Sequence, residues 1–409
     1  MPGSIAIIGG GLAGLATAHA LGAQGIKATV YEAAPALGEI GAAVGTSPQA
    51  NKALAAIGLG DQIAAVANIS PGIYTRTMRD GEFVEYRDGR QAAARFGAPF
   101  YTFHRADLLD ALGQGLDPAA VQLGHRLTGL VEGDDGVSLS FDNGAQVMAD
   151  VVIGADGVRS AVRGALYGAD RPRYTGQMAW RALLKGSDVP RECLEPNGHV
   201  QWIGSGRHFI AYYIRGESVV NIVTQQDTDG WVNEGWSAPG DPDEMRASFP
   251  DAEPRMKALL DLVTQCSKWG LFTRPLTRDW GRGRVQLIGD AAHAMLPNVG
   301  QGACQAFEDA YILARWLGAQ PDDPAEAFRN FRRVRINRVH AVQRLAMQAA
   351  RFKHMQDPAA QKELIASGKG STHGNMEWVW DYDVVADWNK EADVPHVDAS
   401  TWEAEGAGA

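Results

Sequence analysis

The hydrophobic positions at the start of the chain follow a strand–turn–helix–strand pattern. Ile5-Ala6-Ile7-Ile8 is a continuous apolar and mostly β-branched run, typical of a strand buried on both faces. A glycine-rich turn follows, then good helix formers from Leu15 to Gln24, and a second strand from Lys27 to Glu32. A strand–helix–strand unit needs about 30 residues, which is the length found here. The opening therefore predicts a parallel α/β domain.

The pattern changes further along the chain. Residues 137–141 and 146–152 alternate on either side of an Asp-Asn-Gly turn, which predicts a hairpin. Alternating segments recur over 176–225 and predict one antiparallel sheet. A buried strand returns at 285–288, and a long helix is predicted over 302–317. We interpret the antiparallel part as a second domain inserted into the first.

These patterns predict three parts of the chain. The domain opened by the parallel unit would be discontinuous, the inserted domain would be built on the antiparallel sheet, and helices would follow at the C-terminus. The predicted ranges are 1–72, 100–175 and 276–320 for the first domain, 73–99 and 176–275 for the inserted domain, and 321–409 for a helical segment with an acidic tail.

Composition excludes several classes of protein. The 409 residues carry a formal net charge of −10, which disfavours nucleic-acid binding. Cys193, Cys266 and Cys304 include no CxxC pair, so neither a metal site nor a disulfide framework is predicted. Four residues precede the first apolar run and no uninterrupted apolar stretch is long enough for a membrane span, so we expect a cytoplasmic protein. We expect a monomer or homodimer.

Charge is distributed unevenly along the chain. Residues 1–328 carry −10, while residues 329–353 carry +8 and residues 357–409 carry −8. We interpret the arginine-rich segment as a solvent-exposed helix face without a functional role, with apolar residues turned inward. Those residues are Val334, Val339, Val342 and Leu345. We expect the acidic tail to fold back on this basic helix or on that of a partner subunit.

The glycine-rich turn has the spacing G-x-G-x-x-G. Gly9 permits the tight turn, Gly11 lets a pyrophosphate approach the backbone, and Gly14 allows close packing of helix on strand. The phosphates would sit at the helix N-terminus, near Leu12 and Ala13, and Glu32 could bind a ribose. This unit predicts a bound dinucleotide without a 2′-phosphate. It does not separate FAD from NAD.

Two further strands end in glycine and aspartate. Residues 150–160 read DVVIGADGVRS, and residues 283–293 read GRVQLIGDAAH. The second stretch continues into PNVGQG at 297–302 and a helix. An acid at the carboxyl end of a parallel strand faces the ligand crevice, and a glycine-rich helix start can receive an anionic edge. Asp156 and Asp290 are therefore candidate cofactor ligands.

These three motifs together resemble those of the single-component FAD-dependent aromatic hydroxylases, the class A flavoprotein monooxygenases. The resemblance spans residues 9 to 302, and the stretches 174–184, 204–224 and 376–388 look most similar to salicylate hydroxylase. It implies an α/β fold of the GR2, para-hydroxybenzoate-hydroxylase-like type with a Rossmann-like FAD-binding domain. It also implies non-covalent FAD, reduction by transient NADH or NADPH, and oxygen transfer from a flavin C4a-hydroperoxide to a phenolic acid. The substrate would be salicylate-like, with or without decarboxylation.

The resemblance also implies residue roles. In the FAD site, Glu32 would bind the adenosine ribose, Asp290 the ribityl chain, and the loop and helix start Gly300, Gly302 and Ala303 would face the isoalloxazine ring. Arg105 would contact the ribityl–pyrophosphate part, Leu127 would lie near the adenine, and Asp156 belongs to a motif implicated in FAD and NAD(P)H binding. For His293, a buried structural role and a catalytic role both stay open.

The resemblance places His208 on the sheet of the substrate domain, where relatives deprotonate or hydrogen-bond the phenol. Strand alternation puts Tyr212 on the same face. Arg181 is a candidate partner of a substrate carboxylate, with a structural role also open, and Pro297 is a candidate substrate contact. Unlike salicylate hydroxylases, this chain has Asn298 in place of a histidine. Unlike 6-hydroxynicotinate monooxygenases, it also has no histidine in 41–45.

Three alternative functions stay open. The first is hydroxylation of an N-heterocycle of the hydroxypyridine, hydroxynicotinate or urate type by the same chemistry. The others are an NAD-dependent dehydrogenase and a non-catalytic flavin-binding protein.

Overall fold

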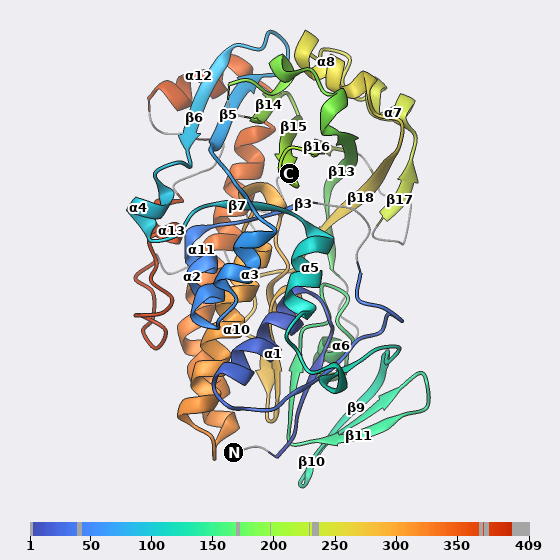
Figure 1. Cartoon of the computed structure of the whole chain (residues 1–409), viewed down its shortest axis with the longest axis vertical. Coiled ribbons are helices and arrows are strands. Elements are labelled where there is room, and N and C mark those ends of the chain that lie inside the picture. The colour runs from blue at the N-terminus through green and yellow to red at the C-terminus, as the bar shows by residue number, and fades with distance from the viewer. Residues whose placement is uncertain are drawn as a thin grey trace.

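The computed structural model describes residues 3–38, 43–168, 172–196, 198–228, 230, 237–367, 371 and 376–394. In this part of the chain the strands form four sheets with helices packed around them (Figure 1). None of the described helices is long and apolar enough to cross a bilayer.

The predicted parallel sheet is present, with the strand order β19-β20-β12-β1-β2-β8. Its strand β1 (Ile5–Ile8) is buried at all four positions and lies between β12 and β2, parallel to both. Only the β19–β20 pair is antiparallel. The other bounds are β2 (Thr29–Tyr31), β8 (Val121–Gln122), β12 (Val151–Gly154), β19 (Gly281–Arg282) and β20 (Val285–Leu287). The carboxyl ends of β1, β12 and β20 therefore meet at one edge.

The predicted hairpin is correct in place but wrong in extent. β10 (Gly136–Phe141) pairs with β11 (Gln146–Ala149) and with β9 (Leu127–Gly133). Residues 151 and 152 do not continue β11. They begin β12 of the parallel sheet, after the chain is redirected at Asp150, whose carboxylate accepts hydrogen bonds from Ser4. The local alternation of residues 146–152 does not show this change, because it depends on two different partner strands, β10 for β11 and β1 for β12.

Helices cover the parallel sheet. α1 (Leu12–Ala23) packs on α10 (Gly302–Ala319), and both begin at the sheet edge where the motif loops lie. A small sheet, β3-β7-β4, lies beside them. The remaining elements of this region are β3 (Ala43–Thr46), α2 (Pro48–Ala56), α3 (Gly60–Ala65), β4 (Asn68–Ile69), α4 (Ala92–Phe96), β7 (Tyr101–His104), α5 (Arg105–Gly113), α6 (Ala161–Tyr167) and α9 (Asp290–His293).

The second large sheet has eight strands in the order β17-β18-β13-β16-β15-β14-β5-β6. Its pairs are antiparallel except β14–β5. The strands are β5 (Gly72–Thr77), β6 (Phe83–Asp88), β13 (Arg173–Lys185), β14 (His199–Gly204), β15 (Arg207–Ile214), β16 (Val219–Asp227), β17 (Ser237–Gly240) and β18 (Cys266–Thr273). It thus combines strands from two distant parts of the sequence.

The two faces of this sheet have different neighbours. α7 (Pro242–Ala247) and α8 (Pro254–Asp261) cover one face, where Met245 and Met256 pack in one cluster with Trp180, Trp202 and Phe209. The opposite face of β15 carries the residues that alternate with Phe209, and these line a cavity shared with the parallel sheet. The sheet therefore provides one wall of the site.

The arginine-rich segment forms most of the 30-residue helix α11 (Pro324–Lys353). Its predicted inward apolar residues are buried, but the interpretation of its cations as a solvated face is wrong at three positions. Arg335, Arg338 and Lys353 are each at most 1% exposed. Arg335 and Arg338 bind the carboxylate of Glu308 on α10, with Nη1–Oε2 and Nε–Oε2 distances of 2.5 and 2.8 Å. A charge can be buried when a partner of opposite sign is buried with it.

The described part of the acidic tail packs against α10 and α11, as expected. The backbone carbonyl of Val379, in α13 (Glu377–Trp380), accepts a hydrogen bond from Arg338 at 2.9 Å. Arg333 pairs with Glu391 at 3.2 Å. A further helix, α12 (Pro358–Ala366), connects α11 to this region. Residues 395–409 of the predicted tail, with Trp402, lie outside the described residues.

Candidate active site

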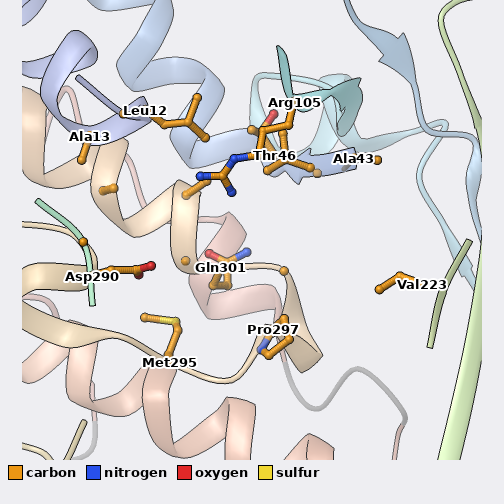
Figure 2. Close-up of a pocket in the computed structure, with 18 of the residues that line it drawn as sticks. Leu12, Ala13, Ala43, Thr46, Arg105, Val223, Asp290, Met295, Pro297 and Gln301 are labelled. Atoms are coloured by element: carbon orange, nitrogen blue, oxygen red, sulfur yellow. The ribbon is translucent and has the colours of Figure 1, made fainter. Parts of the chain in front are cut away.

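A cavity of about 680 Å³ lies between the edge of the parallel sheet and the open face of the large sheet. Figure 2 shows Arg105 extending into it from the top of the view and Asp290 from the left, with Gln301 and Pro297 below Arg105 and Val223 of β16 on the right. A volume of this size is typical of a ligand or cofactor site.

The three motif glycines are required for three different reasons. Gly9 has φ +110°, and a Cβ there would lie 2.5 Å from the carbonyl oxygen of Ala155. A Cβ on Gly14 would lie 1.9 Å from the carbonyl oxygen of Gly9, and Gly14 itself does not line the cavity. At Gly11 a Cβ would meet no atom within 4 Å, and this residue does line the cavity. Gly11 is therefore where a ligand can reach the backbone at the start of α1.

Glu32 fixes the glycine loop as well as facing the cavity. Its carboxylate accepts hydrogen bonds from the backbone N–H groups of Gly10 at 2.6 Å and Ala34 at 2.8 Å. Each carboxylate oxygen can accept a second hydrogen bond, so this arrangement leaves capacity for a ribose hydroxyl.

Arg105 and Asp290 approach the cavity from the starts of α5 and α9. Burial lowers the pKa of the Arg105 guanidinium, and the attraction of Asp290 opposes that shift. The pair provides opposite charges around a polar ligand.

Asp156 lines the cavity, and its carboxylate is also built into the start of α6. It accepts hydrogen bonds from the Ser160 hydroxyl at 2.5 Å and from the Val162 N–H at 3.1 Å. Burial raises the pKa of Asp156, against the effect of these hydrogen bonds. The observed contacts therefore position a turn next to the cavity.

The loop before α10 contains the 3₁₀ turn Pro297–Val299 and Gly300 in the left-handed conformation, with φ +64°. The side chain of Gln301 holds this loop against the start of α2. Its Nε2 donates to the Ser47 hydroxyl and its Oε1 accepts from Gln49, both at 2.9 Å. Sequence reasoning did not single out Gln301 or Gln49. The other predicted residues of the cofactor site that line the cavity are Gly9, Leu12, Ala13, Leu127, Gly300, Gly302 and Ala303.

His208 is completely buried and lines the cavity from β15. Its Nδ1 lies 2.9 Å from Nε2 of His354, the residue after α11. Nδ1 of His354 lies 2.6 Å from Oδ1 of Asp227, whose side chain is 45% exposed. The structure thus brings together a hydrogen-bonded chain from the cavity to the surface. Neither His354 nor Asp227 was found from the sequence, because they lie 146 and 19 residues from His208.

Tyr212 lies on the same face as His208, as strand alternation predicts, and its ring centroid is 4.6 Å from that of His199. Burial raises the pKa of Tyr212 to about 12.

Arg181 also lines the cavity, with its guanidinium 4.1 Å from the centroid of Trp269. Burial, and then repulsion from Arg105, lower the pKa of Arg181 to about 10.

His293 is 1% exposed and does not line the cavity. Its Nε2 lies 2.6 Å from Oδ2 of Asp309, which also accepts a hydrogen bond from the N–H of Gly289 at 3.0 Å. Asp309 in turn binds Arg335 at 2.8 Å. The structure therefore gives His293 the buried structural role, supporting the turn that presents Asp290.

The fold, the glycine loop and the helix starts around the cavity define a dinucleotide-binding α/β protein. The chain belongs to the family described as FAD binding domain, whose model matches residues 3–327. Its relatives are class A FAD-dependent aromatic hydroxylases, and the predicted para-hydroxybenzoate-hydroxylase-like α/β fold is confirmed.

Curated relatives include 3-amino-4-hydroxybenzoate 2-monooxygenase of Streptomyces platensis, 36% identical over 88% of this chain and 90% of the relative. The 6-hydroxynicotinate 3-monooxygenase of Bordetella bronchiseptica is 33% identical, covering 94% and 96%. Salicylate hydroxylase of Pseudomonas putida is 32% identical, covering 94% and 92%. A solved salicylate hydroxylase substrate complex matches with a TM-score of 0.81 and 28% identity, over 97% of this chain and 99% of that one.

The residues present fit FAD. Hydrogen-bond donors for this cofactor are available at the open position of Gly11 and at the N-termini of α1 and α10. Arg105 and Asp290 add a cation and a carboxylate to the same cavity. The chain is thus an FAD-dependent oxidoreductase of the aromatic monooxygenase family. Positions 39–42, which include part of the stretch compared with hydroxynicotinate enzymes, lie outside the described residues.

Proposed function

We propose that this protein uses FAD, O₂ and NADH or NADPH to hydroxylate an aromatic acid that carries a ring hydroxyl. The overall reaction takes one O₂, one NAD(P)H and one proton. It places one oxygen atom on the ring and releases the other as water. Bound FAD supplies the redox and oxygen-transfer chemistry. The named substrates of the relatives support this class, because aminohydroxybenzoate, hydroxynicotinate, 3-hydroxybenzoate and salicylate each combine a carboxylate with a ring hydroxyl.

One observation carries the proposal: a buried histidine lines the same cavity as the FAD cradle and is hydrogen-bonded toward the surface. Removing the proton from a phenol increases electron density at its ortho and para carbons, where oxygen must be transferred. A histidine is suited to this step because its ordinary pKa is near 6.5. His208 is the base in this proposal.

The hydrogen-bonded chain gives the proton a route. When Nδ1 of His208 donates to Nε2 of His354, the lone pair of His208 is on Nε2, as a base requires. The phenol proton moves to that nitrogen, the Nδ1 proton moves to His354, and the Nδ1 proton of His354 moves to Asp227. Asp227 is exposed enough to release it to solvent. The buried face of the sheet around His208 excludes water, which would otherwise favour H₂O₂ release.

The test is a panel of salicylate, 3-hydroxybenzoate, 4-hydroxybenzoate, 3-amino-4-hydroxybenzoate and 6-hydroxynicotinate. NAD(P)H consumption, O₂ uptake and hydroxylated product are measured together. At least one acid should give product in near-equal amount to the NAD(P)H consumed. NAD(P)H oxidation that yields only H₂O₂ with every acid would contradict the proposal. Release of CO₂ with the product would separate a decarboxylating reaction from simple hydroxylation.

A further inference from the structure

Cations line the cavity on both sides, with Arg105, Arg126 and Arg159 outside the large sheet and α11, whereas the carboxylates of the described residues line it on one side alone. The three carboxylates that line it, Glu32, Asp156 and Asp290, all belong to the predicted FAD motifs. The large sheet and α11 contribute Arg87, Arg181 and Lys353, and no carboxylate from these elements lines the cavity among the described residues. This excess of positive charge along the wall favours an anionic ligand over a neutral one.

Arg87 reaches the cavity from β6. Its guanidinium lies over the rings of Phe100 and Trp380, 5.1 Å from each centroid. Its Nε is buried and has no hydrogen-bond acceptor among the described residues. Glu85, two residues earlier, attracts Arg87 electrostatically, and it accepts a hydrogen bond from Ser371 at 3.2 Å. Arg87 therefore holds a planar set of donors in place without a carboxylate bonded to it in the described part of the chain.

Lys353 reaches the cavity from the last turn of α11 and is 1% exposed. Its Nζ donates one hydrogen bond, to the backbone carbonyl of Asn298 at 2.9 Å. An ammonium group has three donors, so two more are present at this point. Burial, and then repulsion from Arg87, lower the pKa of Lys353 to about 7, while Glu85 opposes the shift. An anion beside it would restore its positive charge.

Asn298 completes the cluster. It is 4% exposed, lines the cavity, and neither its Nδ2 nor its Oδ1 has a hydrogen-bond partner among the described residues. An unpartnered buried amide costs free energy unless a ligand satisfies it. Three different elements thus bring a guanidinium, an ammonium and an amide to one part of the cavity wall.

We propose that Arg87, Lys353 and Asn298 form an anion subsite that binds the carboxylate of the aromatic substrate, an inference that deepens and rests on the proposed hydroxylation. A carboxylate can accept two parallel hydrogen bonds from a guanidinium and further ones from the ammonium and amide donors. The flanking rings of Phe100 and Trp380 favour a planar group attached to an aromatic ring. Because His354 follows Lys353 directly, the end of α11 serves both the carboxylate subsite and the base.

The test compares each monohydroxybenzoate with its carboxamide, which has the same shape and no charge. Binding is measured from the change in the flavin absorbance spectrum of the FAD-loaded enzyme, for wild type, Lys353→Met, Arg87→Met and Arg87→Lys. Arg90→Met is the matched control, because Arg90 is exposed and pairs with Asp88. Arg87→Lys keeps the charge without the planar fork and also guards against misfolding of Arg87→Met.

We expect Lys353→Met and Arg87→Met to weaken binding of the acid by about tenfold or more, and of the carboxamide by less than about threefold. Arg87→Lys should fall between wild type and Arg87→Met. Equal weakening of acid and carboxamide, or no weakening, would overturn the subsite. If no acid is hydroxylated yet acids still bind with this dependence on Lys353 and Arg87, the proposed function fails and the subsite stands.

Discussion

At the scale of single residues, the proposed reaction depends on where one proton goes. His208→Asn should lower kcat near pH 7 by about 100-fold, a usual contribution of a general base, with FAD binding retained. His354→Gln and Asp227→Asn should lower it by about tenfold, because they interrupt the route from His208 and leave the base in place.

The pH profile separates this role from a structural one. As pH rises toward the pKa of a phenol, near 10, the substrate arrives already ionised and needs no base. The rates of these three variants should therefore approach that of wild type as pH rises. A constant ratio of rates across the whole pH range would assign the histidines a structural role. FAD content, from the absorbance near 450 nm, is the control for intact folding.

The burial of Lys353 should lower the stability of the ligand-free protein, although the same residue is proposed to bind the substrate carboxylate. The pKa of Lys353 is about 7 in the fold, against 10.5 for an ordinary lysine, so the unfolded chain binds more protons between these values. The cost of burying the cation is complete below pH 7 and disappears as pH rises to 10.5. Lys353→Met should therefore stabilise the ligand-free protein by on the order of 1–3 kcal/mol at pH 6, and by less at pH 9.

The measurement is urea unfolding at both pH values. Lys362→Met is the matched control, since Lys362 is an exposed partner of Glu82 and carries no burial cost. A Lys353→Met protein less stable than wild type at pH 6 would contradict the buried, uncompensated cation.

At the scale of elements, substitutions in the glycine loop and α1 distinguish residues needed for folding from residues needed for cofactor binding. Gly14→Ala would place a Cβ 1.9 Å from the Gly9 carbonyl, so α1 must move off β1 and the protein should be strongly destabilised. Gly11→Ala meets no protein atom within 4 Å, so it should fold normally and lose most of its FAD.

Gly22→Ala is the control within the same helix. Gly22 is exposed and also has nothing within 4 Å, so alanine there should add about 0.5–1 kcal/mol of stability and leave FAD binding unchanged. Thermal unfolding and flavin content measure the three variants together. Full FAD content in Gly11→Ala would contradict the placement of the phosphates.

The same elements show which local patterns were sufficient. The strand Ile5–Ile8 and the strand alternation at His208 and Tyr212 were predicted correctly, because each depends on side chains close in sequence. The helix after the first strand was also predicted, but it begins at Leu12, three residues before the predicted start at Leu15. The end of β11 was predicted at residue 152 instead of Ala149, although the motif at 150–160 indicated a further strand, because the change of sheet depends on Ser4, 146 residues away. The cations of α11 were predicted to lie in solvent, because the carboxylate that is buried with Arg335 and Arg338 belongs to another helix.

At the scale of the whole molecule, the acidic tail is part of the active-site wall. Trp380 lines the cavity beside Arg87, and Val379 accepts the hydrogen bond of the buried Arg338. A chain ending at Gln356 would expose this side of the cavity and leave Arg338 without that acceptor. We expect a fall in Tm of more than about 5 °C and a larger share of NAD(P)H oxidation ending in H₂O₂.

A chain ending at Val394 is the control, since it keeps Trp380, Trp388 and Glu391 and their contacts with Arg87, Trp316 and Arg333. It should match the full chain in Tm and in product formed per NAD(P)H. Unchanged stability and coupling in the shorter truncation would mean that the tail is dispensable.

The sequence alone predicted the cofactor cradle, because the spacing of Gly9, Gly11, Gly14 and Glu32 is typical of a dinucleotide-binding strand–turn–helix–strand unit. It also predicted the faces of the strand that carries His208. Only the tertiary structure decided that Arg87 and Lys353 line the same cavity as His208. It also decided that His354 and Asp227 connect His208 to the surface. Their effect depends on burial and on distances between residues far apart in the chain, and neither quantity has a periodic signal in a single sequence.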